Sequence, residues 1–190
     1  MNASTFSAIV TASTQSDMYS AIASAVGTLK GPLHGGANTA VYELLAKIGD
    51  EASIKPYIDE LLDRKERVMG IGHRIYRTTD PRAVILEALG EEVAEESEER
   101  FYFDLSRKLR DYLGERLAGR PLYPNVDFFS ASVYNMLGIP SDLYTAIFAM
   151  ARSVGWTAHL IEQYANNRLV RPNAVYVGEE SKDFIPISQR

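Results

Sequence analysis

The stretch LYTAIFAMARSVGWTAHL, from Leu143 to Leu160, has apolar residues three or four positions apart, which is the spacing of one face of an α-helix. Few runs in the chain alternate between apolar and polar residues, as half-buried strands do. The helical spacing predicts further helices over Met18–Leu29, Val41–Ile48 and Ile54–Leu62. The sequence therefore predicts an all-α fold.

The longest helix is predicted over about Glu92–Ala118, with Gly119 and Pro121 ending it. Its leading stretch, EEVAEESEER (Glu91–Arg100), contains six glutamates, which could suggest a cation site. We interpret it instead as a solvated helix start, because the helix dipole favours acidic side chains there. An apolar stripe supports the helix and consists of Phe101, Leu105, Leu109, Tyr112 or Leu113, and Leu117.

Composition limits the classes of protein and of site. The chain has 190 residues, of which 46% are hydrophobic and 24% charged, enough for one sizeable core or two small lobes. A net charge of -5 argues against general nucleic-acid binding, so small molecules or proteins are the expected partners. The absence of cysteine excludes disulfides, thiolate catalysis and cysteine-ligated metals, and we expect no metal site. No apolar run reaches the roughly 18 residues of a membrane span, so we expect no membrane partner and a cytoplasmic location.

Three segments interrupt the helical pattern, and the first is GPLHGGAN (Gly31–Asn38). Its Gly-Pro pair forms a turn, and the two glycines after the histidine allow close backbone approach before a helix begins near Ala37. An imidazole beside a helix N-terminus tends to stay neutral and can donate a hydrogen bond to a developing oxyanion. His34 is therefore a candidate electrophile, with a capping or core histidine as the alternative.

The second segment, VMGIGHRIYRTTDPRA (Val68–Ala83), has a glycine turn before His73 and several arginines after it. Backbone amides of such a turn, together with guanidinium groups, suit a phosphate or carboxylate ligand. Arg74 or Arg77 could equally pair with nearby acids, and the GIG triplet falls well short of a dinucleotide-binding fingerprint. The segment predicts an anion site, and its Asp-Pro pair opens the next helix.

The third segment, YPNVDFFSASVYNMLG (Tyr123–Gly138), places Asp127 among apolar and aromatic residues at the start of another helix. A carboxylate in such surroundings loses hydration, which raises its basicity toward the range useful for removing a proton. An N-cap aspartate is the alternative. One acid and two histidines thus lie at helix breaks, and with the arginines they suit acid-base chemistry on a polyanionic substrate.

Five motifs in order, GPLHGGAN, GIGHRIYRTTDPR, PNVDFFS, ARSVGWTAHLIEQ and RP, resemble the citrate synthase family over essentially the whole chain. The resemblance implies a helical fold in which a large and a small domain close on the substrate. In this chain it places large-domain helices at residues 1–36, the small domain at 37–144, and the C-terminal helix and arm of the large domain at 145–190. The last twenty residues are expected to form an arm laid over a surface.

The resemblance also implies a role for each candidate residue. His34 matches the histidine that hydrogen-bonds the acetyl-CoA thioester oxygen, and Asp127 matches the carboxylate that takes a proton from the acetyl methyl group. His73 matches the histidine that protonates the oxaloacetate carbonyl. The arginines that hold the carboxylates of the substrate are matched by Arg82, Arg152 and Arg171, the last supplied by the neighbouring subunit. CoA binding falls on Val68, Gly70, Ile71 and Gly72 for the adenine and on Arg77 for the phosphates.

The implied activity is that of an acyltransferase that condenses acetyl-CoA with oxaloacetate and water to give citrate and CoA, with CoA as a substrate and no tightly bound cofactor. A 2-methylcitrate synthase using propionyl-CoA, or an inactive assembly or acyl-CoA-binding protein, is the alternative. His159 and Trp156 are expected to serve packing or a dimer contact. The likeness begins inside the family pattern, at MNASTF, so we expect a fragment or a separately encoded half. A homodimer or larger oligomer, or a separate N-terminal polypeptide, would then cover its exposed helix faces.

Overall fold

The computed structural model describes residues 1–179 and 181–190, and over these residues it is helical, as predicted, with one isolated bridge between Ile71 and Pro124. Two 3-10 turns, η1 (Ser141–Leu143) and η2 (Ile187–Gln189), accompany the α-helices. The α-helices are α1 (Ala3–Ser13), α2 (Met18–Leu29), α3 (Ala37–Ile48), α4 (Ile54–Asp63), α5 (Pro81–Glu96), α6 (Phe101–Arg116), α7 (Val126–Met136) and α8 (Tyr144–Ala165). None of them is long and apolar enough to cross a membrane.

Short polar side chains fix where several helices begin. Asn2, Asp17, Asp80 and Asn125 cap α1, α2, α5 and α7, each accepting a hydrogen bond from a backbone N–H of the first turn. In α5 a proline follows the cap, where the missing N–H is not needed. Helices α2 and α5 therefore start where the sequence predicts, and α2 also ends there.

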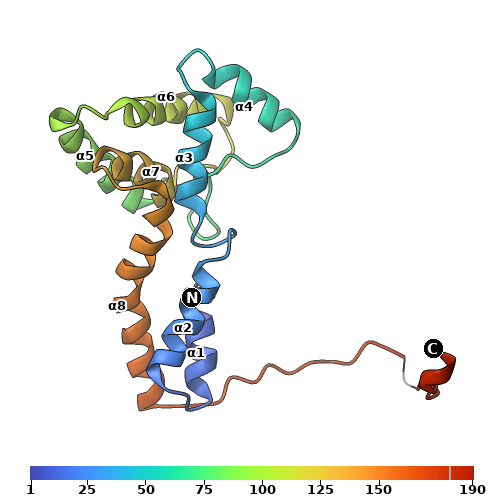
Figure 1. The fold of residues 1–190 in the computed structure, drawn as a ribbon. Coiled ribbons are helices and arrows are strands. Elements are labelled where there is room, and N and C mark those ends of the chain that lie inside the picture. The colour runs from blue at the N-terminus through green and yellow to red at the C-terminus, as the bar shows by residue number, and fades with distance from the viewer. Residues whose placement is uncertain (180) are drawn as a thin grey trace.

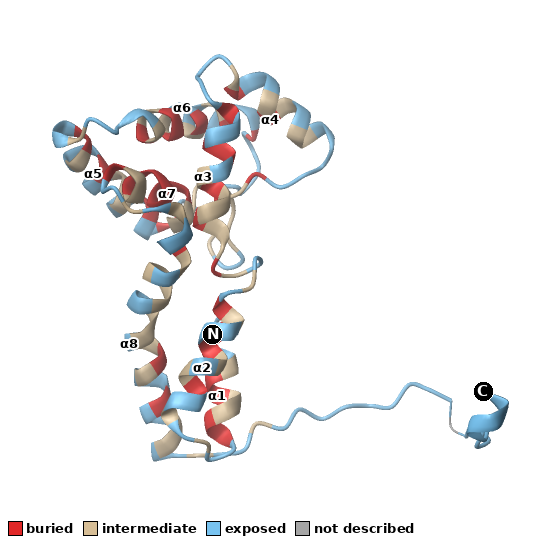
Figure 2. Cartoon of the chain, in the orientation of Figure 1, coloured by how far each residue is buried: buried red, intermediate tan, exposed pale blue. Residues whose placement is uncertain are grey.

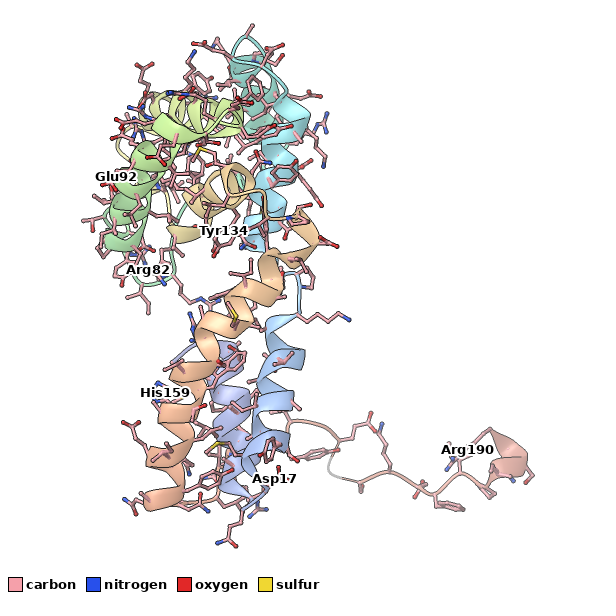
Figure 3. The ribbon with its side chains drawn as sticks, turned by 60° about the vertical axis from the view of Figure 1, so that its left-hand side comes forward. Asp17, Arg82, Glu92, Tyr134, His159 and Arg190 are labelled. Carbon is pink, nitrogen blue, oxygen red and sulfur yellow. The ribbon has the colours of Figure 1, made fainter. Side chains whose placement is uncertain are left out.

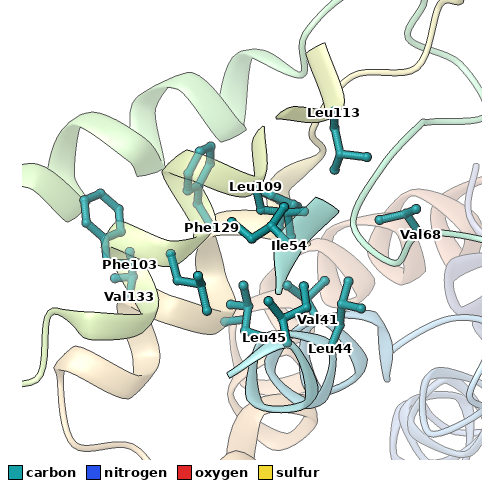
Figure 4. Close-up of a cluster of buried hydrophobic side chains, with 14 of the residues drawn as sticks. Val41, Leu44, Leu45, Ile54, Val68, Phe103, Leu109, Leu113, Phe129 and Val133 are labelled. Atoms are coloured by element: carbon teal, nitrogen blue, oxygen red, sulfur yellow. The ribbon is translucent and has the colours of Figure 1, made fainter. Parts of the chain in front are cut away.

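Helices α3 to α7 surround the larger of two buried clusters (Figures 1 and 2). We call it the first cluster, and it is built mainly from leucine, isoleucine, valine and phenylalanine side chains. Figure 4 shows how α3 and α6 bring them together. The largest fully buried members are Tyr144, Phe103, Phe128, Phe129, Leu45, Ile58 and Leu109.

Helices α1, α2 and α8 pack against one another around a second cluster (Figure 1). It consists of Ala8, Ala12, Ala21, Ala25, Leu29, Trp156 and Leu160. Helix α8 begins in the first cluster at Tyr144 and reaches the second at Trp156, so it connects the two. The domain bounds expected at 36–37 and 144–145 stay a prediction.

The long helix expected over Glu92–Ala118 is wrong, because the chain breaks between α5 and α6 and the longest helix is α8, with 22 residues. Ser97 is extended (φ -100°, ψ 132°), and glutamates on both sides of it repel one another. Arg100 then turns back, pairing with Asp104 at 2.9 Å and donating to the Ala94 carbonyl at 3.5 Å. The expected stripe is buried at Leu105, Leu109, Leu113 and Leu117, whereas Phe101 is exposed and Phe103 fills the core instead.

The C-terminal arm does not cover this chain. Its last described ties to the helices are at Ser13, whose carbonyl accepts from Asn167 and whose Oγ accepts from the Val170 N–H. Beyond that point the described residues are exposed and extend away from the helices (Figure 1). The chain therefore has an extended C-terminal arm, but this arm does not lie over any of the described residues of the chain.

Candidate active site

His34 lies in the turn between α2 and α3, held there by tight packing of the backbone. A Cβ atom at Gly35 would lie 2.4 Å from the Leu29 carbonyl, so this position accepts glycine alone. The Nε2 atom of His34 lies 2.9 Å from Ser4 Oγ and 3.4 Å from the Ser4 backbone N. Helix α3 does begin at Ala37 as expected, but the helix N-terminus that faces the ring belongs to α1.

These contacts decide which nitrogen of His34 carries the proton. Burial, together with the charge of Arg152, lowers the pKa of His34, so the ring is neutral at pH 7. The Ser4 amide points at Nε2, which makes Nε2 an acceptor and leaves the proton on Nδ1. His34 thus has the neutral, donating form that an electrophile needs. Ser4, which also accepts from the Trp156 indole at 3.2 Å, was missed by the sequence reasoning.

His73 follows a turn in which Gly70 and Gly72 have φ of 78° and 88°, values that favour glycine. Its Nδ1 atom accepts hydrogen bonds from the backbone N–H groups of Ile75 and Tyr76, both at 3.1 Å. The ring also stacks on Tyr76 with 4.5 Å between centroids. Because Nδ1 is an acceptor, the proton is on Nε2, where it can be donated to a ligand.

Asp127 is in the first turn of α7, but Asn125 is the N-cap, so the capping alternative for Asp127 is wrong. Burial raises the pKa of Asp127, while the charges of Arg82, His73 and Arg152 oppose the rise. A carboxylate that is short of hydration yet held near cations is a stronger base than an exposed aspartate.

The two nearby arginines differ in how they are held. Arg82 makes a two-point ion pair with buried Asp80 (2.7 and 3.0 Å), and Figure 3 shows it at the end of α5 nearest to α8. Arg152 lies over Phe148, 4.9 Å from the ring centroid, and its Nη1 atom is buried without a hydrogen-bond partner among the described residues. Burial and the charge of Arg82 lower the pKa of Arg152. A guanidinium with a buried, unsatisfied nitrogen atom suits a carboxylate ligand.

The structure gathers most of the predicted residues but not all. Asp127 lies within the electrostatic reach of His73, Arg82 and Arg152, and Arg152 in turn affects His34. Arg171 is exposed on the extended arm, beyond the last described tie to the helices. His159 is exposed on α8 and lies 3.2 Å from Glu162, whereas Trp156 is fully buried in the second cluster.

A cavity of about 800 Å³ opens beside the His73 turn. Its wall includes all five residues expected to bind CoA: Val68, Gly70, Ile71, Gly72 and Arg77. Their role stays a prediction. The wall also carries Arg74, which belongs to the predicted anion site, and three basic side chains that the sequence reasoning missed: Lys65, Arg67 and Arg120. Four more cations around a glycine turn strengthen the case for a ligand with several phosphates. No group of three or more metal-ligating side chains occurs among the residues that the structure describes.

Comparison with known proteins shows which proteins this chain is similar to. The citrate synthase of Haloferax volcanii is 50% identical over 192 residues, covering 100% of this chain and 50% of that protein. The 2-methylcitrate synthase of Shewanella oneidensis is 46% identical, covering 100% of this chain and 50% of its own length. The chain thus spans about half the length of the curated relatives it matches.

Solved structures agree with the sequence matches. Citrate synthase from Thermoplasma acidophilum, solved in a ternary complex with carboxymethyl coenzyme A and oxaloacetate, superposes with a TM-score of 0.92 at 41% identity. It is matched over 100% of this chain and 51% of that one. A family profile described as "Citrate synthase, C-terminal domain" matches residues 1–173. The chain therefore belongs to the citrate synthase family.

Proposed function

We propose that this chain supplies the catalytic groups that condense acetyl-CoA with oxaloacetate and water to give citrate and CoA. The observation that carries the proposal is Asp127, a partly buried carboxylate of raised pKa lying near His73, Arg82 and Arg152. A base of this kind is costly to bury and has no evident structural use, since Asn125 already caps the helix.

In the first step Asp127 removes a proton from the acetyl methyl group, and the negative charge moves to the thioester oxygen. Removing such a proton with a carboxylate is steeply uphill in water, so the oxygen needs a preoriented donor in a water-poor site. His34 supplies this donor through Nδ1–H, because Ser4 holds the opposite nitrogen.

In the second step the methylene carbon of the enolate forms a bond to the carbonyl carbon of oxaloacetate. The Nε2 proton of His73 passes to the carbonyl oxygen, which becomes the hydroxyl of the product. Arg82 and Arg152 hold the carboxylates of oxaloacetate, and Arg171 from a neighbouring subunit adds a third contact. Water then cleaves the thioester and releases CoA.

The CoA moiety is assigned to the cavity beside the His73 turn, with Arg77 among the phosphate ligands. The Thermoplasma acidophilum relative, solved with a CoA analogue and oxaloacetate, supports this choice of substrates. Arg120 lines the same cavity, so we add it to the phosphate-binding residues.

The proposed assembly is a homodimer or larger oligomer, with or without a separate N-terminal polypeptide, in the cytoplasm. Exposed apolar side chains support it: Met150, Val154 and Ile161 on α8, Phe6 on α1 and Val26 on α2 lie outside the second cluster. Apolar side chains gathered on adjoining helices are more often covered by a partner than left in water.

The test is CoA release from acetyl-CoA and oxaloacetate, first with the chain alone and then with the N-terminal half of the Haloferax volcanii relative added. Asp127→Asn is expected to lower turnover by about a thousandfold, because the amide keeps the shape but cannot take the proton. Asp142→Asn, an exposed aspartate of η1, is the matched control. Turnover by Asp127→Asn close to that of the wild type would remove this residue from the mechanism.

A second candidate, 2-methylcitrate synthase, is favoured by relatives of that name at 46% and 43% identity. It is tested by replacing acetyl-CoA with propionyl-CoA in the same assay and comparing kcat/KM. CoA binding without turnover, in every combination of polypeptides, would instead support the non-catalytic acyl-CoA-binding protein.

A further inference from the structure

Two segments that carry the proposed site are far apart in sequence and meet at Asn125. The Asn125 backbone N–H donates to the Gly70 carbonyl at 2.9 Å, and its side-chain Nδ2 donates to the Gly72 carbonyl at 2.9 Å. The Gly72 N–H returns a bond to the Tyr123 carbonyl at 2.7 Å. The turn that precedes His73 is thus bonded along its length to the segment that precedes Asp127.

The other end of the same side chain holds Asp127. The Oδ1 atom of Asn125 accepts from the Asp127 N–H at 3.0 Å and so caps α7. The turn also packs directly on this helix start, since a Cβ atom at Gly70 would lie 3.0 Å from the Phe128 Cα atom. One amide group therefore connects the backbone of the His73 turn with the backbone of Asp127.

Capping alone does not require asparagine. Serine and aspartate cap helices about as well, because each supplies an acceptor oxygen. Neither places an N–H donor beside that oxygen, whereas the asparagine amide has both. The hydrogen bond to the Gly72 carbonyl is therefore a separate property of Asn125 that its capping role does not explain.

We propose that Asn125 is a positioning residue that fixes His73 and Asp127 relative to each other through this bond. Its catalytic meaning rests on the proposed function, in which the proton donor and the base act on two substrates that must meet. A misplacement of about 1 Å can cost around a hundredfold in rate. The bond itself, and its effect on the turn, stand independently of any activity.

The structural test is hydrogen exchange of the full chain, measured by mass spectrometry. In Asn125→Ser, the amides of Ile71, Gly72, Ile75 and Tyr76 should exchange about five- to tenfold faster, the effect of losing one hydrogen bond. Amides of α7 should exchange as in the wild type, because serine keeps the cap. Asn125→Asp, which also caps but cannot donate to the carbonyl, should loosen the same turn.

Asp17→Ser is the matched control, because it changes the N-cap of α2, which makes no contact with the turn. It should leave exchange of residues 68–77 unchanged. Unchanged exchange of the turn in Asn125→Ser would overturn the proposal, as would equal loosening of α7, which would make Asn125 a helix cap only.

The functional readout is a split between kcat and KM in the assembly that releases CoA. Asn125→Ser should lower kcat by about tenfold or more, while the urea midpoint of unfolding should fall by no more than the loss of one hydrogen bond explains. A looser turn with unchanged kcat would refute the catalytic part. If the wild-type protein shows no turnover at all, the proposed function fails, while hydrogen exchange still decides whether Asn125 ties the two segments.

Discussion

The two clusters of this chain are both helical but are packed very differently. Twenty described residues form the first, with phenylalanine, leucine and isoleucine side chains from four helices, α3, α4, α6 and α7. Seven form the second, and four of these are alanines. Alanine lets helices approach closely but buries little apolar area, so Trp156 and Leu160 supply much of what holds α8 to α1 and α2. The first cluster is therefore a large hydrophobic core, whereas the second buries little apolar area.

The proposed site takes residues from both regions. Asp127 on α7, Arg82 on α5 and His73 in the turn between α4 and α5 belong to the well-packed region. Ser4 lies on α1, Arg152 on α8 and His34 in the turn after α2. The distance between base and electrophile therefore depends on the more weakly packed region. Mutations in the two regions should therefore have different effects: in the first region they change stability, and in the second they change the geometry of the site as well.

The largest effect is expected from Phe103→Ala in the first cluster. Phe103 is fully buried against Phe129 and Gly90, so its removal should lower the free energy of unfolding by about 3–5 kcal/mol. Phe101→Ala, on the same helix but 52% exposed, should change it by about 0.5 kcal/mol or less. Urea denaturation followed by circular dichroism measures both. Equal losses of stability in the two variants would mean that a buried phenylalanine of the first cluster contributes no more than an exposed one.

A smaller effect is expected from Trp156→Phe in the second cluster. The ring remains apolar, but the hydrogen bond to Ser4 Oγ is lost, which should cost about 1–2 kcal/mol of stability. Because Ser4 also orients His34, CoA release should fall more than stability predicts. Glu162→Gln, a change of an exposed polar side chain on the same helix, serves as the reference. A loss of stability without any additional loss of turnover would separate the second cluster from the site.

Local sequence patterns account for the helix starts and helix bounds that could be predicted from the sequence. Asp17 and the Asp80-Pro81 pair mark helix starts by side-chain chemistry alone, and helical spacing gave α2 its observed bounds. The same reasoning failed at the glutamate run (Glu91–Glu99). Each glutamate by itself favours a helix, but several neighbouring glutamates repel one another, and individual propensities do not include this repulsion.

The partners of the site could not be predicted in this way. Ser4 meets His34 across 30 residues, and Asn125 meets Gly72 across 53, so neither pairing leaves a local pattern. His34, His73 and Asp127 were predicted because they stand at breaks in the helical spacing. The residues that orient them were found only when folding brought distant segments together.

A third prediction concerns the exposed apolar side chains of the second region. Val154→Lys, at a position that is 75% exposed, should not destabilise the monomer, since the side chain makes no core contact. If a partner covers this face, the charge should weaken self-association by about tenfold or more. Sedimentation at several protein concentrations measures the effect, with Lys55→Ala on α4 as the control. Unchanged association would mean that α8 is not part of the contact.

The smallest effect is expected from Asp127→Asn on the free energy of unfolding. This effect should be opposite in sign to that of the corresponding substitution at Asp17 in the second region. Burial raises the pKa of Asp127 above its ordinary 3.8, so the folded protein binds this proton more tightly than the unfolded chain. Between 3.8 and the raised pKa, stability falls as pH rises, and above that window the cost is fully present. The asparagine variant lacks this cost and should unfold at a higher urea concentration at pH 7, with the gain shrinking as the pH falls toward 3.8.

Asp17, at the start of α2, should behave in the opposite way. Hydrogen bonds from Ser20 lower the pKa of Asp17, so its charge contributes stability above 3.8 that is lost as pH falls through the lowered pKa. Asp17→Asn should therefore be less stable than the wild type at pH 7, and the deficit should shrink in acid. Urea midpoints at pH 7 and at pH values down to about 3 test both variants. If Asp127→Asn were the less stable variant at pH 7, the cations around Asp127 would outweigh its burial, and the carboxylate would be an ion-pair partner rather than a base kept ready by desolvation.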